Sequence, residues 1–199
     1  MPIQSTDSNI YGVDSVPSIF VDGSPTFSLG GPLSDGAKSF SLLTQIVERR
    51  LSVKPAINIA LNGGLVDSVV SVKGKVSKSA ETKGLKLRLA LIERTVHYSG
   101  ENGIHFHHCV VRSLIDYTDR MSFDSSGAIA SIEQSIDLNR LTSSLKDYLD
   151  SYESKNSSGR SIHFSEKKHQ INREDLAVIA FVQNENTKEI LQAQYVSLK

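Results

Sequence analysis

Hydrophobic and polar residues alternate over several short runs of this chain, which is the pattern of strands that bury one face. In the run LKLRLALIERTVHY (residues 85–98), leucines occupy every second position from Leu85 to Leu91, and Lys86 and Arg88 lie between them. This alternation predicts a half-buried strand of an antiparallel sheet.

Other segments show the same texture, separated by turn residues. One long strand is expected to carry Val66, Val70, Val72 and Val76 on a single parity, and the glycine pair in Asn62-Gly63-Gly64 is expected to form the turn before it. A loop is expected at 99–104, and a turn at 184–187. The remaining strands are predicted at residues 57–61, 106–115, 131–137, 176–183 and 189–198.

Two segments have the periodicity of helices instead. Phe40, Leu43, Val47 and Leu51 fall on one stripe and predict a helix over 35–51, which ends before Pro55. A second helix is expected over 139–153, with its hydrophobic side packed on the sheets; that side consists of Leu141, Leu145, Tyr148, Leu149 and Tyr152.

The amino-terminal part is expected to be organised differently from the rest. Residues 18–21 and 26–29 predict two strands around the turn Asp22-Gly23, so this part is a hairpin followed by a helix. We therefore divide the chain into residues 1–54, and residues 55–199, which form a mainly β sandwich with one inserted helix. The whole is expected to be α+β, with an antiparallel β-sandwich as its main body.

The charge balance narrows the classes of function. The 199 residues contain 22 Lys and Arg and 22 Asp and Glu, so the formal net charge is zero. A nucleic-acid-binding domain usually carries a basic face, and the basic pairs here, Arg49-Arg50 and Lys167-Lys168, are short. No nucleic-acid partner is expected.

Neither export nor membrane insertion is visible in the sequence. The opening MPIQSTDSNIYG lacks the apolar run of a signal peptide, and no segment reaches the ~20 apolar residues of a membrane-spanning helix. A single cysteine excludes an intramolecular disulfide. The sequence therefore indicates a chain without a transmembrane segment, which suits the cytoplasm unless a longer precursor exists.

Four histidines and the only cysteine lie within HYSGENGIHFHHCVVR, residues 97–112. On a regular strand His105, His107 and Cys109 would share one face, and His97 would lie across the loop. Imidazole and thiolate groups suit Zn²⁺ or Cu²⁺, so these four residues are a candidate metal site. The alternative is structural, with some side chains in the core and others forming loop hydrogen bonds.

Catalytic motifs are not apparent in the sequence. His108 and Cys109 are adjacent and would point to opposite faces of a strand, so they could not share a proton. The sequence lacks a phosphate-binding glycine loop and the Cys-x-x-Cys pair needed for dithiol chemistry. The chain is therefore expected not to be an enzyme and to need no cofactor.

Two stretches resemble known families. Val16-Pro17, the hairpin and the helix 35–51 resemble the second half of a thioredoxin fold, which implies a cis bond before Pro17. The pattern LRLALIERTVHYSGENG–IHFHHCVVRSL, with LAVIAFVQNENTKEILQA near the end, resembles the immunoglobulin-like sandwich domain of bacterial envelope proteins in which a thioredoxin-like domain comes first. The first half of that thioredoxin-like domain has no counterpart here.

The resemblance implies a periplasmic or extracellular place, and an immunoglobulin-like sandwich behind a partial thioredoxin-like unit. Our hypothesis from the sequence is a non-enzymatic module for protein interaction or envelope support, in which the stripe from Phe40 to Leu51 packs on the sandwich or on a second copy. The alternatives are a metal-binding protein that uses His97, His105, His107 and Cys109, or the carboxyl-terminal part of a longer thioredoxin-like redox protein.

Overall fold

The computed structural model describes residues 11, 18–25, 33–78, 84–99, 103–117, 129–154 and 163–198. The helices are α1 (Gly36–Leu51) and α2 (Leu138–Ser154), with short 3₁₀ turns at Leu33–Asp35 and Arg173–Asp175. The strands are β1 (Phe20–Val21), β2 (Ser24–Pro25), β3 (Ile57–Val66), β4 (Val69–Lys78), β5 (Leu85–His97), β6 (Phe106–Asp116), β7 (Ile129–Asp137), β8 (Leu176–Asn184) and β9 (Ile190–Ser197).

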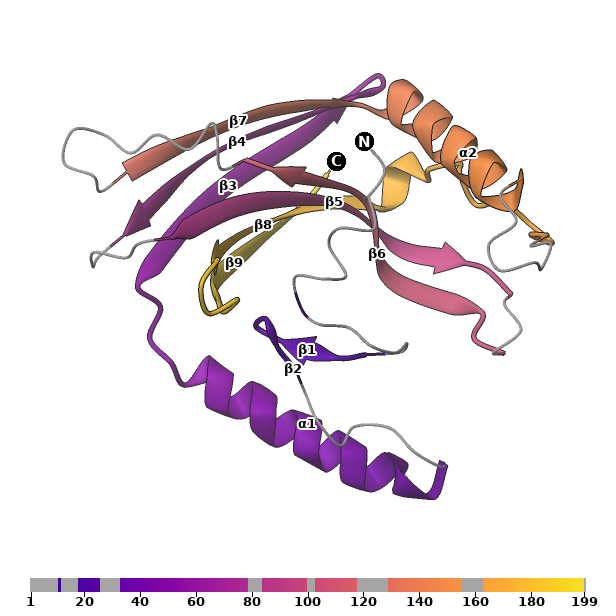
Figure 1. The fold of residues 1–199 in the computed structure, drawn as a ribbon. Helices are drawn as coiled ribbons and strands as arrows, with labels where there is room; N and C mark the ends of the chain where they lie inside the picture. Colours follow the sequence, from indigo (N-terminus) through magenta and orange to yellow (C-terminus); the bar gives the residue numbers. More distant parts are fainter. Residues whose placement is uncertain are drawn as a thin grey trace.

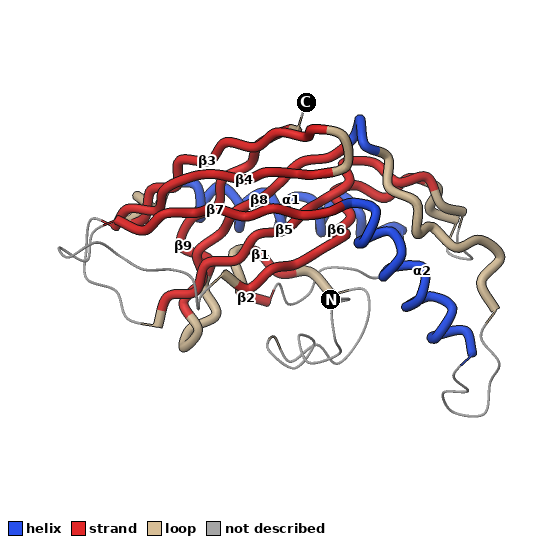
Figure 2. The backbone as a smooth tube through the Cα atoms, turned by 90° about the horizontal axis from the view of Figure 1, so that it is seen from above, coloured by secondary structure: helices blue, strands red, loops and turns tan. Residues whose placement is uncertain are grey.

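The main body is an antiparallel β-sandwich, as the alternation predicted. One sheet has the strand order β3-β4-β7 and the other β6-β5-β8-β9. The chain changes sheets after β4, after β6 and after β7, which are connections of the Greek-key kind. Figure 1 shows the two layers, with α1 lying below them, and Figure 2 shows α2 extending beyond one end of the sheets. The fold is mainly β, and α+β as a whole.

Valine, isoleucine and leucine side chains fill the space between the sheets. The buried set includes Val70, Val72 and Val76 from one sheet and Leu87, Leu89 and Leu91 from the other. The two sheets come together along β3 and β9, where a Cβ on Gly63 would lie 2.8 Å from Leu198 Cδ2. Gly63 is therefore in close contact with the β9 side, because a side chain there would force the Leu198 side chain to move.

Tyr117 joins the sheets on the opposite side. It follows β6, is buried, and its hydroxyl donates to the carbonyl of Glu133 in β7 at 2.8 Å. The same hydroxyl accepts from the Glu133 N–H at 2.7 Å. One side chain thus satisfies both backbone groups of a β7 residue from the other sheet.

The predicted turn at Asn62-Gly63-Gly64 is wrong. β3 continues through it to Val66, and the chain reverses at Asp67 and Ser68, where Asp67 has a φ of 53°. Val66 consequently belongs to β3 and is 72% exposed, although β4 buries the other three valines of the predicted stripe. Pairing between β3 and β4 continues from Ile57 to Val66, and this long pairing outweighs the local preference of the glycines for a turn.

β5 is buried on both faces, so the expected half-buried strand is only partly right. Leu87, Leu89 and Leu91 face the main core, but Ala90 and Ile92 on the other face belong to a second buried cluster. Arg88 is 7% exposed and donates to Gln183 Oε1 at 2.5 Å. A strand at the centre of a sheet can be covered twice, which alternation alone does not reveal.

Helix α2 follows the prediction closely in extent but not in the placement of its tyrosines. Leu138 and Leu141 are buried in the main core. Tyr148 and Tyr152, expected to pack on the sandwich, are 42% and 43% exposed and contact each other with ring centroids 6.1 Å apart. The helix leaves the sheets after its first turns, so its later aromatic residues lie outside the core (Figure 1).

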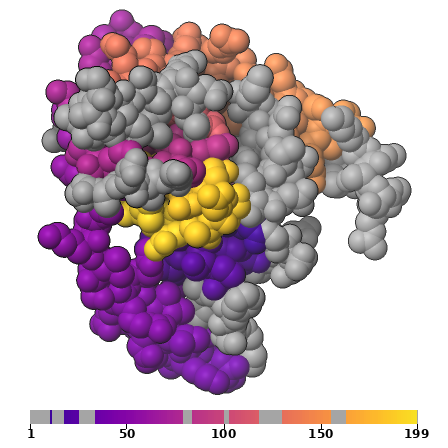
Figure 3. All heavy atoms as spheres, turned by 60° about the vertical axis from the view of Figure 1, so that its left-hand side comes forward, coloured from indigo at the N-terminus to yellow at the C-terminus, as the bar shows by residue number. Residues whose placement is uncertain are grey.

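The amino-terminal hairpin and α1 lie beside the carboxyl-terminal strands. Figure 3 shows the yellow residues near the end of the chain against the indigo hairpin, with the purple helix α1 below them. The turn Asp22-Gly23 is present, whereas the strand predicted at 26–29 and the bond before Pro17 lie outside the described residues. Within the described ranges, no helix is both long and apolar enough to cross a bilayer.

Candidate functional site

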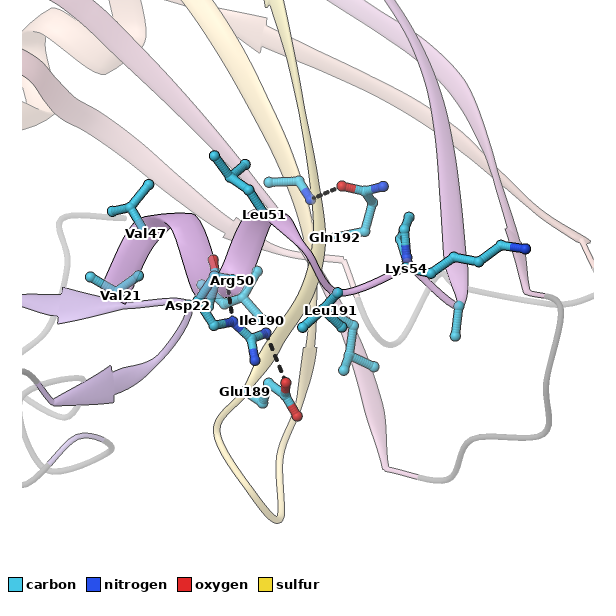
Figure 4. A pocket seen from close by; sticks show the side chains of 14 residues that line it. Val21, Asp22, Val47, Arg50, Leu51, Lys54, Glu189, Ile190, Leu191 and Gln192 are labelled. Carbon is cyan, nitrogen blue, oxygen red and sulfur yellow. Dashed lines mark hydrogen bonds and ion pairs between the residues drawn. The ribbon is translucent and has the colours of Figure 1, made fainter. Parts of the chain in front are cut away.

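A groove of about 610 Å³ separates the end of α1 from the first residues of β9. Figure 4 shows its walls, with Val47 and Leu51 from α1 on one side and Ile190, Leu191 and Gln192 on the other. The complete lining is Val21, Asp22, Val47, Arg50, Leu51, Val53, Lys54, Pro55, Ala56, Glu189, Ile190, Leu191, Gln192 and Ala193. Most of these side chains are apolar, so the groove offers a surface for another hydrophobic group.

Arg50 fixes the position of the helix beside this groove. Its Nε lies 2.7 Å from Asp22 Oδ2, and its Nη2 lies 2.8 Å from Glu189 Oε1 (Figure 4). The hydrogen bonds to Asp22 and then to Glu189 raise the pKa of Arg50 above its ordinary value. One guanidinium therefore ties α1 to both the hairpin and the β8–β9 turn.

The hairpin turn itself packs tightly on the sandwich. Asp22 and Gly23 have φ values of 48° and 80°, the left-handed pair of a tight hairpin turn. A Cβ on Gly23 would lie 1.9 Å from the Lys188 carbonyl oxygen, and the Ile190 N–H donates to the Asp22 carbonyl at 2.9 Å. Only glycine allows this approach, so the turn holds Asp22 where Arg50 can reach it.

Three of the four residues of the apolar stripe of α1 are exposed rather than covered by the sandwich, and the fourth, Leu43, is half-buried. None of the sixteen residues of this helix, all of them described, is buried. Phe40 is 73% exposed, Leu51 79% and Val47 38%. Val53, just after the helix, is 54% exposed. Val47, Leu51 and Val53 also line the groove, so exposed apolar side chains of this region lie at its edge, as they do at interaction sites of soluble proteins.

The predicted metal ligands lie at the far end of the β5–β6 hairpin. The rings of His97 and His105 are stacked with centroids 6.4 Å apart, and His105 Nδ1 lies 2.9 Å from Ser99 Oγ. His107 turns the other way, with Nε2 3.2 Å from the Tyr98 carbonyl oxygen. Among the residues that the structure describes, no three His, Cys, Asp or Glu side chains are grouped so that they could hold a metal ion.

Cys109 breaks the alternation on which the predicted shared face depended. Its φ is 54°, in the left-handed region, and its side chain is exposed. His107 and Val110, three positions apart, consequently line the same pocket. The expected common face of His105, His107 and Cys109 is therefore wrong, because regular alternation requires extended backbone at every position.

No local feature of the sequence indicated that the charged residues of the groove would lie together. The stripe on α1 was visible, but Asp22, Arg50 and Glu189 are ordinary charged residues separated by 28 and 139 positions. Only the packing of the hairpin on the β8–β9 turn brings them together.

Comparison with known proteins bears on the fold alone. HBP35 of Porphyromonas gingivalis is similar over 96% of this chain, with a TM-score of 0.58 and 15% identity. The match spans 55% of HBP35, so this chain corresponds to about half of that protein. A domain of the outer membrane lipoprotein Omp28 from the same organism aligns with 74% of this chain and 91% of its own length, at a TM-score of 0.36 and 13% identity. No protein-family description and no curated protein matches the sequence.

Proposed function

We propose that the chain is a non-enzymatic interaction module that pairs with a second copy of itself through helix α1. The observation that carries this proposal is the spacing of the exposed stripe. Its exposed members Phe40, Val47 and Leu51, together with Gly36, lie within about 60° of one another on the helix, at 100° per residue.

The stripe is symmetric about the middle of the helix. In an antiparallel pair centred between Leu43 and Thr44, Phe40 faces Val47 of the partner helix and Leu51 faces Gly36 of the partner helix. Each large side chain then lies against a smaller one, which is how helices interlock. Nothing lies within 4 Å of the position that a Cβ on Gly36 would take, so there is room for the leucine.

The charges of the helix allow this pairing. Lys38 and Arg49 lie about 140–180° from these four positions and point away from the proposed contact, at 100° per residue. Arg50 is already engaged by Asp22 and Glu189. A two-fold contact in which each copy uses the same surface closes on itself and produces a dimer rather than a filament.

The interface is expected to be small and the dimer weak. A helix of sixteen residues is about 24 Å long, and we expect a pair of such short helices to bury less than the roughly 1,200–2,000 Å² of stable interfaces. The groove beside β9 enlarges the contact. We therefore expect a dissociation constant on the order of micromolar. The resemblance of the sequence to bacterial envelope proteins is our reason for expecting this dimer in the cell envelope.

Cross-linking tests the antiparallel register directly. Two chains are made in a Cys109→Ser background, one with Gly36→Cys and the other with Leu51→Cys. Mixed under mild oxidation, they should form a disulfide between unlike chains. Each alone should not, because two copies of residue 36 would lie about 22 Å apart.

Two outcomes would contradict the proposal. Cross-linking of each single variant to itself would indicate parallel helices. The dimer would be excluded by two results together. The Gly36→Cys and Leu51→Cys mixture would form no more disulfide than a Lys38→Cys control on the opposite face, and the protein would be a monomer in sedimentation velocity at 100 µM. A Phe40→Lys variant should be monomeric throughout that concentration range.

A further inference from the structure

A second pocket, distinct from the α1 groove, lies where α2 departs from the end of the β5–β6 hairpin. Its volume is about 400 Å³, within the range of small-molecule sites. Three elements form it: the hairpin, α2, and the segment 163–168, here called the strap. The lining residues are Val96, Tyr98, His107, Val110, Arg112, Leu145, Tyr148, Leu149, Phe164, Glu166 and Lys168.

The strap is held on both sides, so the pocket is already formed. Lys167 Nζ lies 2.6 Å from Asp150 Oδ1 and also pairs with Glu153 of α2. Glu153 Oε1 accepts the Phe164 N–H at 3.1 Å, which positions an aromatic wall of the pocket. On the hairpin side, Arg112 Nη1 donates to the Lys168 carbonyl at 2.7 Å. A preformed site loses little free energy to ordering when it binds.

Two aromatic walls line the pocket. Tyr98 and His107 belong to the hairpin, with ring centroids 6.1 Å apart. Tyr148 and Phe164 line it from α2 and the strap, and both contact Tyr152, at centroid distances of 6.1 Å and 6.0 Å. The aliphatic side chains of the lining complete the pocket. Aromatic rings prefer to pack on other rings in offset or tilted arrangements, so this shape favours a flat aromatic guest.

The charged side chains of the lining are already paired. Arg112 contacts Glu93 at 2.7 Å, and both side chains are less than one-tenth exposed. Lys168 pairs with Glu166. A charged guest would have to compete with these pairs, whereas an uncharged guest would not.

His107 supplies a directional polar group. Its Nε2 lies 3.2 Å from the Tyr98 carbonyl oxygen, which can only accept, so Nε2 carries the hydrogen. In the neutral ring Nδ1 is then a hydrogen-bond acceptor. We propose that this pocket binds a small, uncharged, planar aromatic molecule that carries an O–H or N–H donor.

The test uses two probes of nearly equal shape. 2-Naphthol has an O–H donor, and 2-methoxynaphthalene does not. Isothermal titration calorimetry at pH 7.5 should show one molecule of 2-naphthol bound per chain, at least fivefold more tightly than the methoxy compound. A His107→Phe variant should bind the two compounds equally, because the acceptor is lost and the flat wall is kept.

Filling the pocket should abolish binding. Val110→Arg and Leu149→Arg enter it from opposite walls, and each should weaken 2-naphthol binding at least tenfold. The matched control, Val47→Arg in the α1 groove, should leave it unchanged. Because Leu149 does not belong to the main core, although its helix begins there, that variant remains informative if Val110→Arg fails to fold.

Three results would overturn the proposal: no saturable binding of either probe, binding that survives both arginine variants, or binding lost in Val47→Arg instead. The last would assign the probe to the α1 groove. Val47→Arg also disrupts the proposed dimer. Unchanged 2-naphthol binding in this variant would therefore show that ligand binding does not depend on dimerisation, and either proposal can fail without the other.

Discussion

The ion pair between Glu93 and Arg112 allows a quantitative test of how the β5–β6 hairpin is stabilised. The two side chains are 6% and 8% exposed. Arg112 Nε and Nη2 lie 2.8 Å and 2.7 Å from the same oxygen, Glu93 Oε2. The perturbation is Arg112→Met, which keeps most of the side-chain volume and removes the charge.

The expected loss follows from what the variant leaves behind. Among the residues that the structure describes, Glu93 then keeps only a 3.3 Å hydrogen bond from the Asn172 N–H, and the carbonyls of Lys168 and Gln170 lose their donor. Removing one partner of a buried pair costs about 3–5 kcal/mol, mainly because the other charge remains buried. We expect a loss of that size in the free energy of unfolding.

A double-mutant cycle separates the pair from its surroundings. The double variant Glu93→Leu/Arg112→Met should be more stable than Arg112→Met alone, because no unpaired charge is buried. The coupling energy should be at least about 2 kcal/mol. Urea denaturation followed by circular dichroism, in a Phe40→Lys background to exclude dimerisation, gives the four free energies.

The matched control is Arg94→Met. Arg94 pairs with Asp175 at 2.8 Å, but its side chain is 43% exposed, so about 1 kcal/mol or less should be lost. A coupling below about 0.5 kcal/mol, or an Arg112→Met variant no less stable than Arg94→Met, would refute the reasoning from burial.

Three further measurements test other parts of the structure. Gly23→Ala should lower the free energy of unfolding by about 1–3 kcal/mol because of its φ of 80° and the Lys188 carbonyl, and Gly64→Ala should not; equal losses would contradict this. Tyr117→Phe should cost about 1–3 kcal/mol through the unsatisfied Glu133 backbone, unlike Tyr195→Phe on the surface. Hydrogen bonds from Lys146 and then Lys167 lower the pKa of Asp150 to about 2, so its stabilising effect is present above pH 4 and lost as the pH falls towards 2. A carbon-13 titration should show the Asp150 midpoint rising towards 3.8 in Lys146→Gln but not in Lys73→Gln.

Local periodicity predicted most helices and strands of this chain. The helix expected at 35–51 is Gly36–Leu51, and the one expected at 139–153 is Leu138–Ser154. The strand pair near the end, and the sandwich as a class, also followed from alternation. These features depend on residues close in sequence, because the spacing of the hydrophobic residues indicates which face of a helix or strand is buried.

The tertiary structure decided how far the strands extend and which side chains share a surface. Gly63 belongs to a predicted turn, yet it lies inside β3 because the pairing with β4 continues through it. Gly74 lies inside β4, where the Ala60 carbonyl leaves no room for a side chain. The left-handed backbone at Cys109 breaks the alternation along β6, so His107 and Val110 line the same pocket with α2. Asp22, Arg50 and Glu189 meet only because the hairpin turn packs on the β8–β9 turn. Such contacts join residues far apart in the chain, so they cannot be predicted from the pattern of neighbouring residues.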